Sequence, residues 1–92
     1  MKVWLVGTCD CETTHIAHVC LSEETAMKRW EEIRKELIHE NEEMRDYHRG
    51  VGYEWGDDAY NRRIKNLSET DPTKMDNYPQ EEPFIRETET ED

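Results

Sequence analysis

The segment CDCETTHIAHVC, residues 9–20, places three cysteines and two histidines within twelve positions. Cysteine thiolates and histidine nitrogens are preferred ligands of Zn²⁺, so this segment could hold a metal ion. Thiols with a lowered pKa could instead support redox chemistry. The pairing of the strands that carry these side chains determines which of them face one another, and therefore which of these two hypotheses is possible.

Residues 2–21 are predicted to form a β-hairpin with strands at 2–11 and 15–21. The first strand opens with residues of high β-propensity, VWLV, and ETTH is typical of a turn. If the chain turns at Thr13–Thr14, alternate side chains of both strands share one face of the sheet. On that face the hairpin would bring together a zinc set of Cys9, Cys11, His18 and Cys20.

The cysteine spacing argues against this zinc-binding alternative. Zinc ribbons use C-x₂₋₄-C pairs, whereas Cys9 and Cys11 form a C-x-C pair inside a strand, with Cβ atoms about 7 Å apart. We therefore expect no metal and no cofactor, and interpret the cysteines as a partly buried face under a helix. An odd number of cysteines also fits a reducing compartment better than a disulfide framework.

Residues 22–49 are predicted to form a long amphipathic helix. Ser22 is a suitable N-cap and Gly50 a suitable stop. Such a helix would be roughly 40 Å long, whereas a globule of this size is about 25–30 Å across. Its second half must therefore project, bend or pack on something else. The predicted apolar stripe consists of Ala26, Trp30, Ile33, Leu37, Met44 and Tyr47.

The rest of the chain completes a single domain, residues 1–92. We expect a short helix at 57–67, a proline-containing loop at 68–83, and a strand with an acidic tail at 84–90. The fold class is α+β: a small antiparallel sheet, made of the N-terminal hairpin plus the C-terminal strand, packed against one long helix, with a second short helix. The last strand should pair beside the first and cover its exposed edge.

The composition indicates which partners the protein can bind. Twelve basic and 23 acidic residues give a net charge of −11, which repels phosphate groups. We therefore expect no direct nucleic-acid binding and no membrane binding, and instead a basic, nucleic-acid-handling protein as partner. The sequence has no signal peptide pattern and no apolar run long enough for a membrane span, so we expect a cytoplasmic protein. It also lacks nucleophile and phosphate-loop motifs, and we predict no enzymatic activity.

The candidate partner-binding residues lie on the second half of the long helix and in the connection that follows it. Acidic residues offer charge to a basic surface, and aromatic residues between polar ones are typical interface anchors. An alternative is that the chain is an obligate oligomer subunit of unknown role, such as a homodimer built through the projecting half of the helix. The candidate set is Glu36, Glu40, Glu42, Glu43, Asp46, Tyr53 and Trp55.

The strand-to-helix junction HIAHVCLSEETA resembles a group of small proteins common in bacteriophage and prophage genomes. Those proteins share an N-terminal β-hairpin followed by a helix, with a valine, an aromatic residue, a serine, an acidic pair and an alanine at the junction. The matching residues are Val19, Ser22, Glu23, Glu24 and Ala26, while Cys20 stands in place of the aromatic residue. The group has no known catalytic residues. The resemblance implies an acidic phage-encoded inhibitor of host defence, similar to anti-CRISPR proteins, which would act in the host cytoplasm and mimic nucleic acid.

Overall fold

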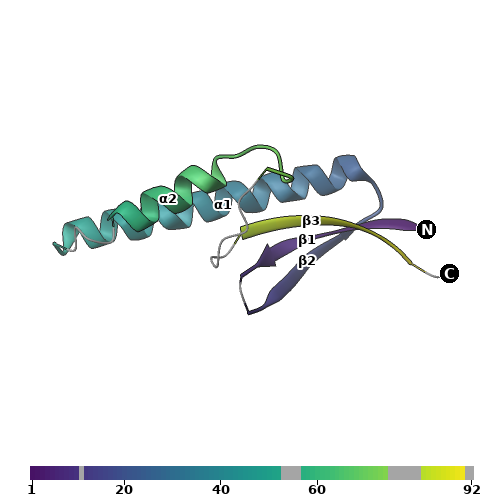
Figure 1. Cartoon of the computed structure of the whole chain (residues 1–92), viewed down its shortest axis with the longest axis horizontal. Coiled ribbons are helices and arrows are strands. Elements are labelled where there is room, and N and C mark those ends of the chain that lie inside the picture. Colours follow the sequence, from purple (N-terminus) through teal and green to yellow (C-terminus); the bar gives the residue numbers. More distant parts are fainter. Residues whose placement is uncertain (11, 53–56, 75–81, 91–92) are drawn as a thin grey trace.

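The structure, a computed structural model, has the expected α+β fold, with a three-stranded antiparallel sheet packed on a long helix (Figure 1). It describes residues 1–10, 12–52, 57–74 and 82–90. The elements in chain order are β1 (Lys2–Cys9), β2 (Thr14–Cys20), α1 (Glu23–Gly50), α2 (Asp57–Leu67) and β3 (Glu82–Glu89).

The sheet has the strand order β2-β1-β3, which confirms the prediction that the last strand pairs beside the first. β1 and β3 pair without interruption, from Lys2 opposite Glu89 to Cys9 opposite Glu82. The ladder continues past the strands, since the backbone amide of Thr90 donates to the carbonyl of Met1 at 2.9 Å. Met1 and Thr90 therefore lie at the same end of the sheet. β1 and β3 run side by side to this end (Figure 1).

The hairpin register differs from the prediction because the chain turns between Cys9 and Thr14, which lie opposite each other, rather than at Thr13–Thr14. In addition, β2 contains a β-bulge at Ala17. Val6 lies opposite His18, but Gly7 lies opposite Ile16, so Ala17 is the extra residue. The bulge brings the β2 backbone unusually close to β1. A Cβ atom added to Gly7 would lie 1.8 Å from the carbonyl oxygen of His15, so only glycine fits there.

Local side chains and a glycine define the ends of α1. Ser22 is the N-cap, as predicted: its backbone is extended and its hydroxyl oxygen accepts the amide of Thr25 at 3.2 Å. At the other end, Gly50 is still helical, and the residue with a positive φ, 86°, is Gly52. Since left-handed backbone favours glycine, Gly52 rather than Gly50 turns the chain away from the helix.

The core lies between the sheet and the first half of α1. Trp30 is fully buried at its centre, and its indole N–H donates to the carbonyl oxygen of Pro83 at the start of β3, at 3.2 Å. This bond satisfies the polar atom of the largest buried side chain. The other buried residues of this cluster are Val6, Cys20, Ala26, Leu37 and Leu67.

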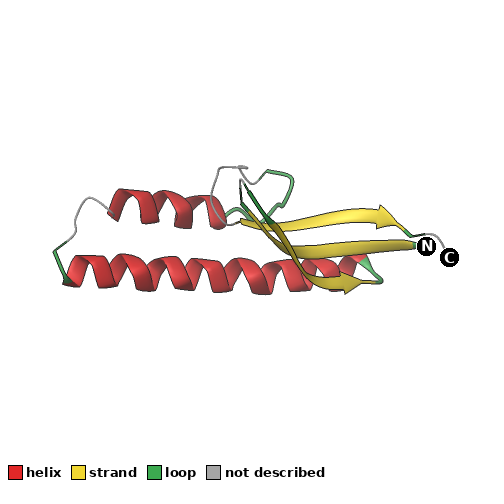
Figure 2. Ribbon diagram, turned by 90° about the horizontal axis from the view of Figure 1, so that it is seen from below, coloured by secondary structure: helices red, strands yellow, loops and turns green. Residues whose placement is uncertain are grey.

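The second half of α1 packs against α2, which runs antiparallel beside it (Figure 2). Arg45 on α1 donates to the side-chain oxygen of Asn61 at 2.9 Å, and the rings of His48 and Tyr60 meet edge-on at 5.3 Å. The second half of α1, which is too long for the globule, therefore packs on α2. The molecule is elongated, 55 × 24 × 20 Å. A homodimer through this half of α1 stays a prediction.

The predicted apolar stripe of α1 is wrong at its C-terminal end. Met44 and Tyr47 are 45% and 65% exposed, because α2 covers a different side of the helix. Instead, Arg34 is buried one turn after Trp30. A strict apolar repeat cannot reveal such a position, because the burial of a charged residue depends on partners elsewhere in the chain.

Arg34 joins α1 to the end of α2. Its guanidinium binds both carboxylate oxygens of Glu31, at 2.8 and 3.1 Å, and donates to the carbonyl oxygen of Leu67 at 2.9 Å. The hydrogen bonds from Arg34 hold the pKa of the Glu31 carboxyl below its ordinary value of 4.5. The bidentate pair with Glu31 satisfies the buried charge, and the bond to Leu67 caps the last turn of α2.

Substitution of Gly7 by alanine should destabilise the protein by about 1–3 kcal/mol, because the new methyl group would collide with the β2 backbone. Urea unfolding measures this change. Gly50→Ala is the matched control, since a Cβ atom there meets nothing within 4 Å, and its stability should be unchanged or slightly higher. Equal stability of the Gly7→Ala variant and the native chain would contradict the observed register.

Replacement of Arg34 by methionine should lower the free energy of unfolding by about 1–3 kcal/mol at neutral pH. A carboxyl whose pKa is lowered on folding contributes stability above its ordinary pKa, and that contribution is lost as the pH falls through the folded-state value. The difference between native and Arg34→Met proteins should therefore shrink below pH 4.5. Urea unfolding across this range is the measurement, and a difference that is independent of pH would rule out the Glu31 contribution.

Candidate partner-binding surface

Four glutamates form a continuous line along the solvent side of α1, which we call the acidic row: Glu32, Glu36, Glu40 and Glu43. They are spaced by four, four and three residues, which places them on one helix face because the helix has 3.6 residues per turn. All four are exposed. Glu36, Glu40 and Glu43 belong to the predicted partner-binding set, whereas Glu32 was missed, although the same four-residue spacing marks it.

The two ends of the acidic row have basic side-chain partners, an arginine at one end and a histidine at the other, whereas the middle is more open. Arg29 lies 3.0 Å from Glu32, and His39 lies 2.9 Å from Glu43. Within the described part of the chain, Glu36 and Glu40 have no cation within 4.0 Å. The strongest uncompensated negative charge of the row is therefore at these two residues.

The other predicted acidic residues of α1 do not belong to the row. Glu42 is only partly exposed and lies about 160° around the helix from Glu40. Asp46 is exposed but lies 3.3 Å from Arg45 and 3.8 Å from Arg49, so its charge is compensated. The two predicted aromatic anchors, Tyr53 and Trp55, lie outside the described residues.

Tyr47 takes a place beside the acidic row that the sequence reasoning did not give it. It lies one turn beyond Glu43 and is exposed. An exposed tyrosine next to carboxylates offers both apolar area and a hydroxyl to a partner. Its helical spacing from Leu37 and Met44 made it look like a core residue.

The acidic residues of β3 contribute less free charge than their number implies. Glu87 pairs with Lys2 at 3.0 Å. Glu82 is buried, where its carboxylate accepts the side-chain amide of Asn66 at 2.9 Å. Glu82 therefore links the start of β3 to α2.

The register of the hairpin separates the proposed zinc ligands. Cys20 lies opposite Trp4, and Cys9 lies opposite Thr14, whereas a turn at Thr13–Thr14 would pair Cys20 with Gly7 and Cys9 with His18. Since Trp4 and Cys9 are five residues apart on β1, the two sulfurs lie on opposite faces of the sheet and about 17 Å apart along it. Cys11 lies outside the described residues.

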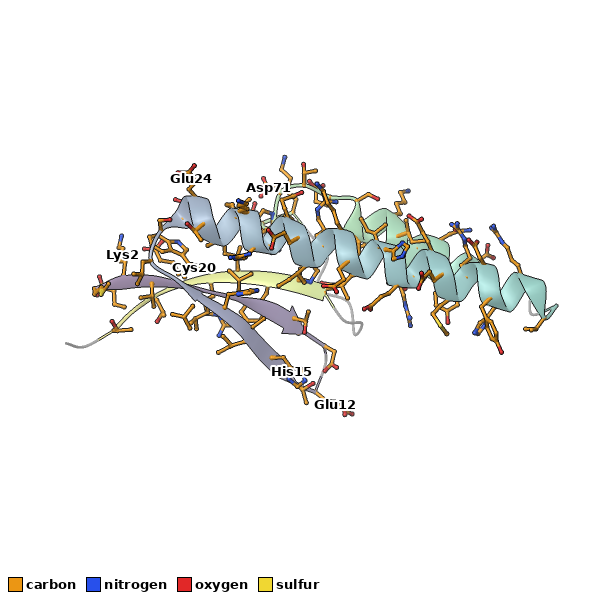
Figure 3. The ribbon with its side chains drawn as sticks, turned by 180° about the vertical axis from the view of Figure 1, so that it is seen from behind. Lys2, Glu12, His15, Cys20, Glu24 and Asp71 are labelled. Carbon is orange, nitrogen blue, oxygen red and sulfur yellow. The ribbon has the colours of Figure 1, made fainter. Side chains whose placement is uncertain are left out.

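The two described thiols differ in surroundings. Cys20 is in the core, facing the start of α1 (Figure 3). Partial burial, followed by the charge of Glu82, raises the pKa of the Cys9 thiol above its ordinary value. The raised pKa keeps Cys9 in the thiol form at neutral pH, which makes it a poor nucleophile. Among the described residues, no three His, Cys, Asp or Glu side chains are grouped to hold an ion.

Comparison with known proteins gives no relative that could assign a role to these residues. No family model matches the chain, and neither a curated protein nor a solved structure matches it. None of the helices in the described ranges has the length and apolarity that a membrane crossing needs.

Addition of a metal chelator should leave the melting temperature of the purified protein unchanged, because Cys9, His18 and Cys20 do not converge on one point. Differential scanning calorimetry with and without the chelator makes the comparison. A fall of several degrees that added Zn²⁺ reverses would contradict the observed separation of Cys9 and Cys20.

Proposed function

We propose that this chain is a non-enzymatic accessory protein that binds a basic, nucleic-acid-handling protein and occupies the surface on which that protein holds nucleic acid. The acidic row carries the proposal. Its carboxylates would stand where phosphates stand in the natural ligand. The resemblance to small phage proteins supports a narrower version, in which the chain is a viral inhibitor of a host-defence complex and acts in the host cytoplasm.

The spacing of the acidic row supports mimicry of a phosphate backbone. Glu32 and Glu43 are eleven residues apart, about 17 Å along the helix, in steps of about 5–6 Å. A DNA strand carries one phosphate per 3.4 Å of helix axis, so the row offers about one carboxylate for every one to two nucleotides. Arginine and lysine side chains that bind phosphates can reach carboxylates at this spacing.

The overall charge supports the same partner class. A net charge of −11 on an elongated body creates a field that attracts a basic surface and increases the rate of encounter. α1 alone is about 42 Å long, the length of roughly twelve base pairs. A basic channel built for a duplex therefore has room for the whole helix.

Removing the two uncompensated charges should weaken binding. The partner is first captured from host lysate and purified, and its affinity is then measured for the native chain and for Glu36→Gln/Glu40→Gln. We expect about a tenfold loss, because both charges face solvent without a cation. The native affinity should also fall as salt rises through the physiological range, and duplex DNA or RNA should compete.

The matched control is Glu24→Gln/Glu89→Gln, which removes two exposed charges outside the acidic row. This variant should lose much less affinity than the row variant. Equal losses would mean that only net charge matters, and an affinity independent of salt would exclude the mimicry.

A further inference from the structure

The outer edge of β2 carries none of the charged side chains or prolines that usually protect an edge strand, and its one protective feature is the bulge at Ala17. β2 is at the rim of the sheet, and no other described element lies beside it (Figure 1). Its sequence, THIAHVC, contains no proline, lysine, arginine or acid. Edge strands usually carry such residues, because an edge presents unpaired backbone N–H and C=O groups to other chains.

The opposite edge of the sheet, β3, shows the contrast within the same molecule. It contains Pro83, which cannot donate a backbone hydrogen bond, together with Arg86, Glu87 and Glu89. These residues discourage the addition of another strand. The difference between the two edges leaves β2 as the edge with fewer obstacles to the addition of a strand.

The face of the sheet that turns away from α1 adds apolar area beside the β2 edge. Leu5 pairs with Val19 on this face, and Gly7 pairs with Ile16. Ile16 and Val19 are 55% and 62% exposed. On the β3 side, the guanidinium of Arg86 lies over the ring of Phe84, so the uncovered apolar surface is concentrated along β2.

We propose that the β2 edge binds an extended segment of the basic partner, which adds a fourth strand to the sheet. Backbone hydrogen bonds would hold the segment, and its apolar side chains would contact Ile16 and Val19. This inference rests on the proposed function only for the basic character of the partner. It gives that partner a second contact, on a surface separate from the acidic row.

Charges at the hairpin tip favour a basic segment. Asp10 and Glu12 are exposed at the end of β2, and Glu12 points away from α1 (Figure 3). The backbone amides of Glu12 and Thr13 donate to the Asp10 carboxylate at 2.8 and 2.7 Å and lower its pKa, so it is charged at neutral pH. A lysine or arginine in the docked segment would meet this tip.

A second copy of this chain fits the edge less well. It would carry its own charge of −11 to the same place and meet long-range repulsion. The bulge at Ala17 also increases the twist of the edge, so a short segment follows it more easily than a flat sheet does.

Titration of the ¹⁵N-labelled protein with an end-capped peptide that alternates lysine and valine tests the proposal. The peptide has the length of β2, seven residues. We expect weak binding, with a dissociation constant of about 0.1–1 mM, and amide shifts confined to residues 14–20. The same peptide N-methylated at alternate residues keeps its charge but cannot complete the backbone ladder, and should bind about tenfold more weakly.

Val19→Glu separates strand addition from simple charge attraction. The added negative charge would strengthen binding if attraction alone were responsible, whereas strand addition predicts about a tenfold loss, because the apolar contact is removed. Met44→Glu is the matched control: it adds the same charge at an exposed apolar residue of α1 and should not weaken binding.

Several results would overturn the proposal: no shifts at residues 14–20, equal binding of the N-methylated peptide, or tighter binding by Val19→Glu. Protection of β2 amides that rises with protein concentration in the absence of peptide would identify a second copy as the occupant instead. The acidic row is tested separately, since Glu36→Gln/Glu40→Gln should leave the peptide shifts on β2. If the peptide shifts on β2 are absent but the acidic-row variant still loses affinity for the partner, the β2 contact fails. If the peptide shifts are present but the acidic-row variant loses no affinity, the proposed function fails.

Discussion

Trp30 and Arg34 stack on each other and together connect the sheet, α1 and α2. The guanidinium carbon of Arg34 lies 5.8 Å from the centre of the Trp30 ring, one helical turn away. Trp30 donates to the start of β3 through Pro83, while Arg34 donates to the end of α2 through Leu67. Because both residues are buried, neither bond can be replaced by water without a loss of stability. A chain with only 34% apolar residues thus uses two directional contacts to unite a small core.

This arrangement leaves the solvent side of α1 without a structural role. One side of the helix contacts the sheet and α2, so the side that carries the acidic row can accept substitutions with little effect on folding. The exposed side chains of β2 that lie on the face away from α1, Ile16 and Val19, can likewise be substituted with little effect on folding. The fold therefore separates the residues that stabilise it from the two surfaces that are open to a partner.

Local signals in the sequence predicted the elements, and long-range contacts decided what the sequence could not show. Ser22 as an N-cap, and a short helix at 57–67, follow from residues adjacent in the chain. The strand register was wrong because the chain turns between Cys9 and Thr14 instead of at Thr13–Thr14, and one extra residue, Ala17, then reverses the facing of everything beyond it. The burial of Arg34 could not be predicted, since its acceptor, the carbonyl oxygen of Leu67, is 33 residues away. For the candidate surface, the shared face of Glu36, Glu40 and Glu43 was predictable from spacing, whereas the pairing of Asp46 and the exposure of Tyr47 depend on how α2 packs.

α1 is one helix in its hydrogen bonding, but its two halves have unequal support. The half that contains Trp30 rests on the sheet, whereas the half that ends at Gly50 rests, among the described elements, on α2. Backbone amides near Gly50 should therefore open by local unfolding at a lower free energy than those near Trp30. The acidic row crosses this boundary, with Glu32 on the firmly held half and Glu43 on the other. A partner that binds the whole acidic row would order the half of α1 that ends at Gly50. The conformational entropy lost there would set an upper limit on the affinity that charge alone can achieve.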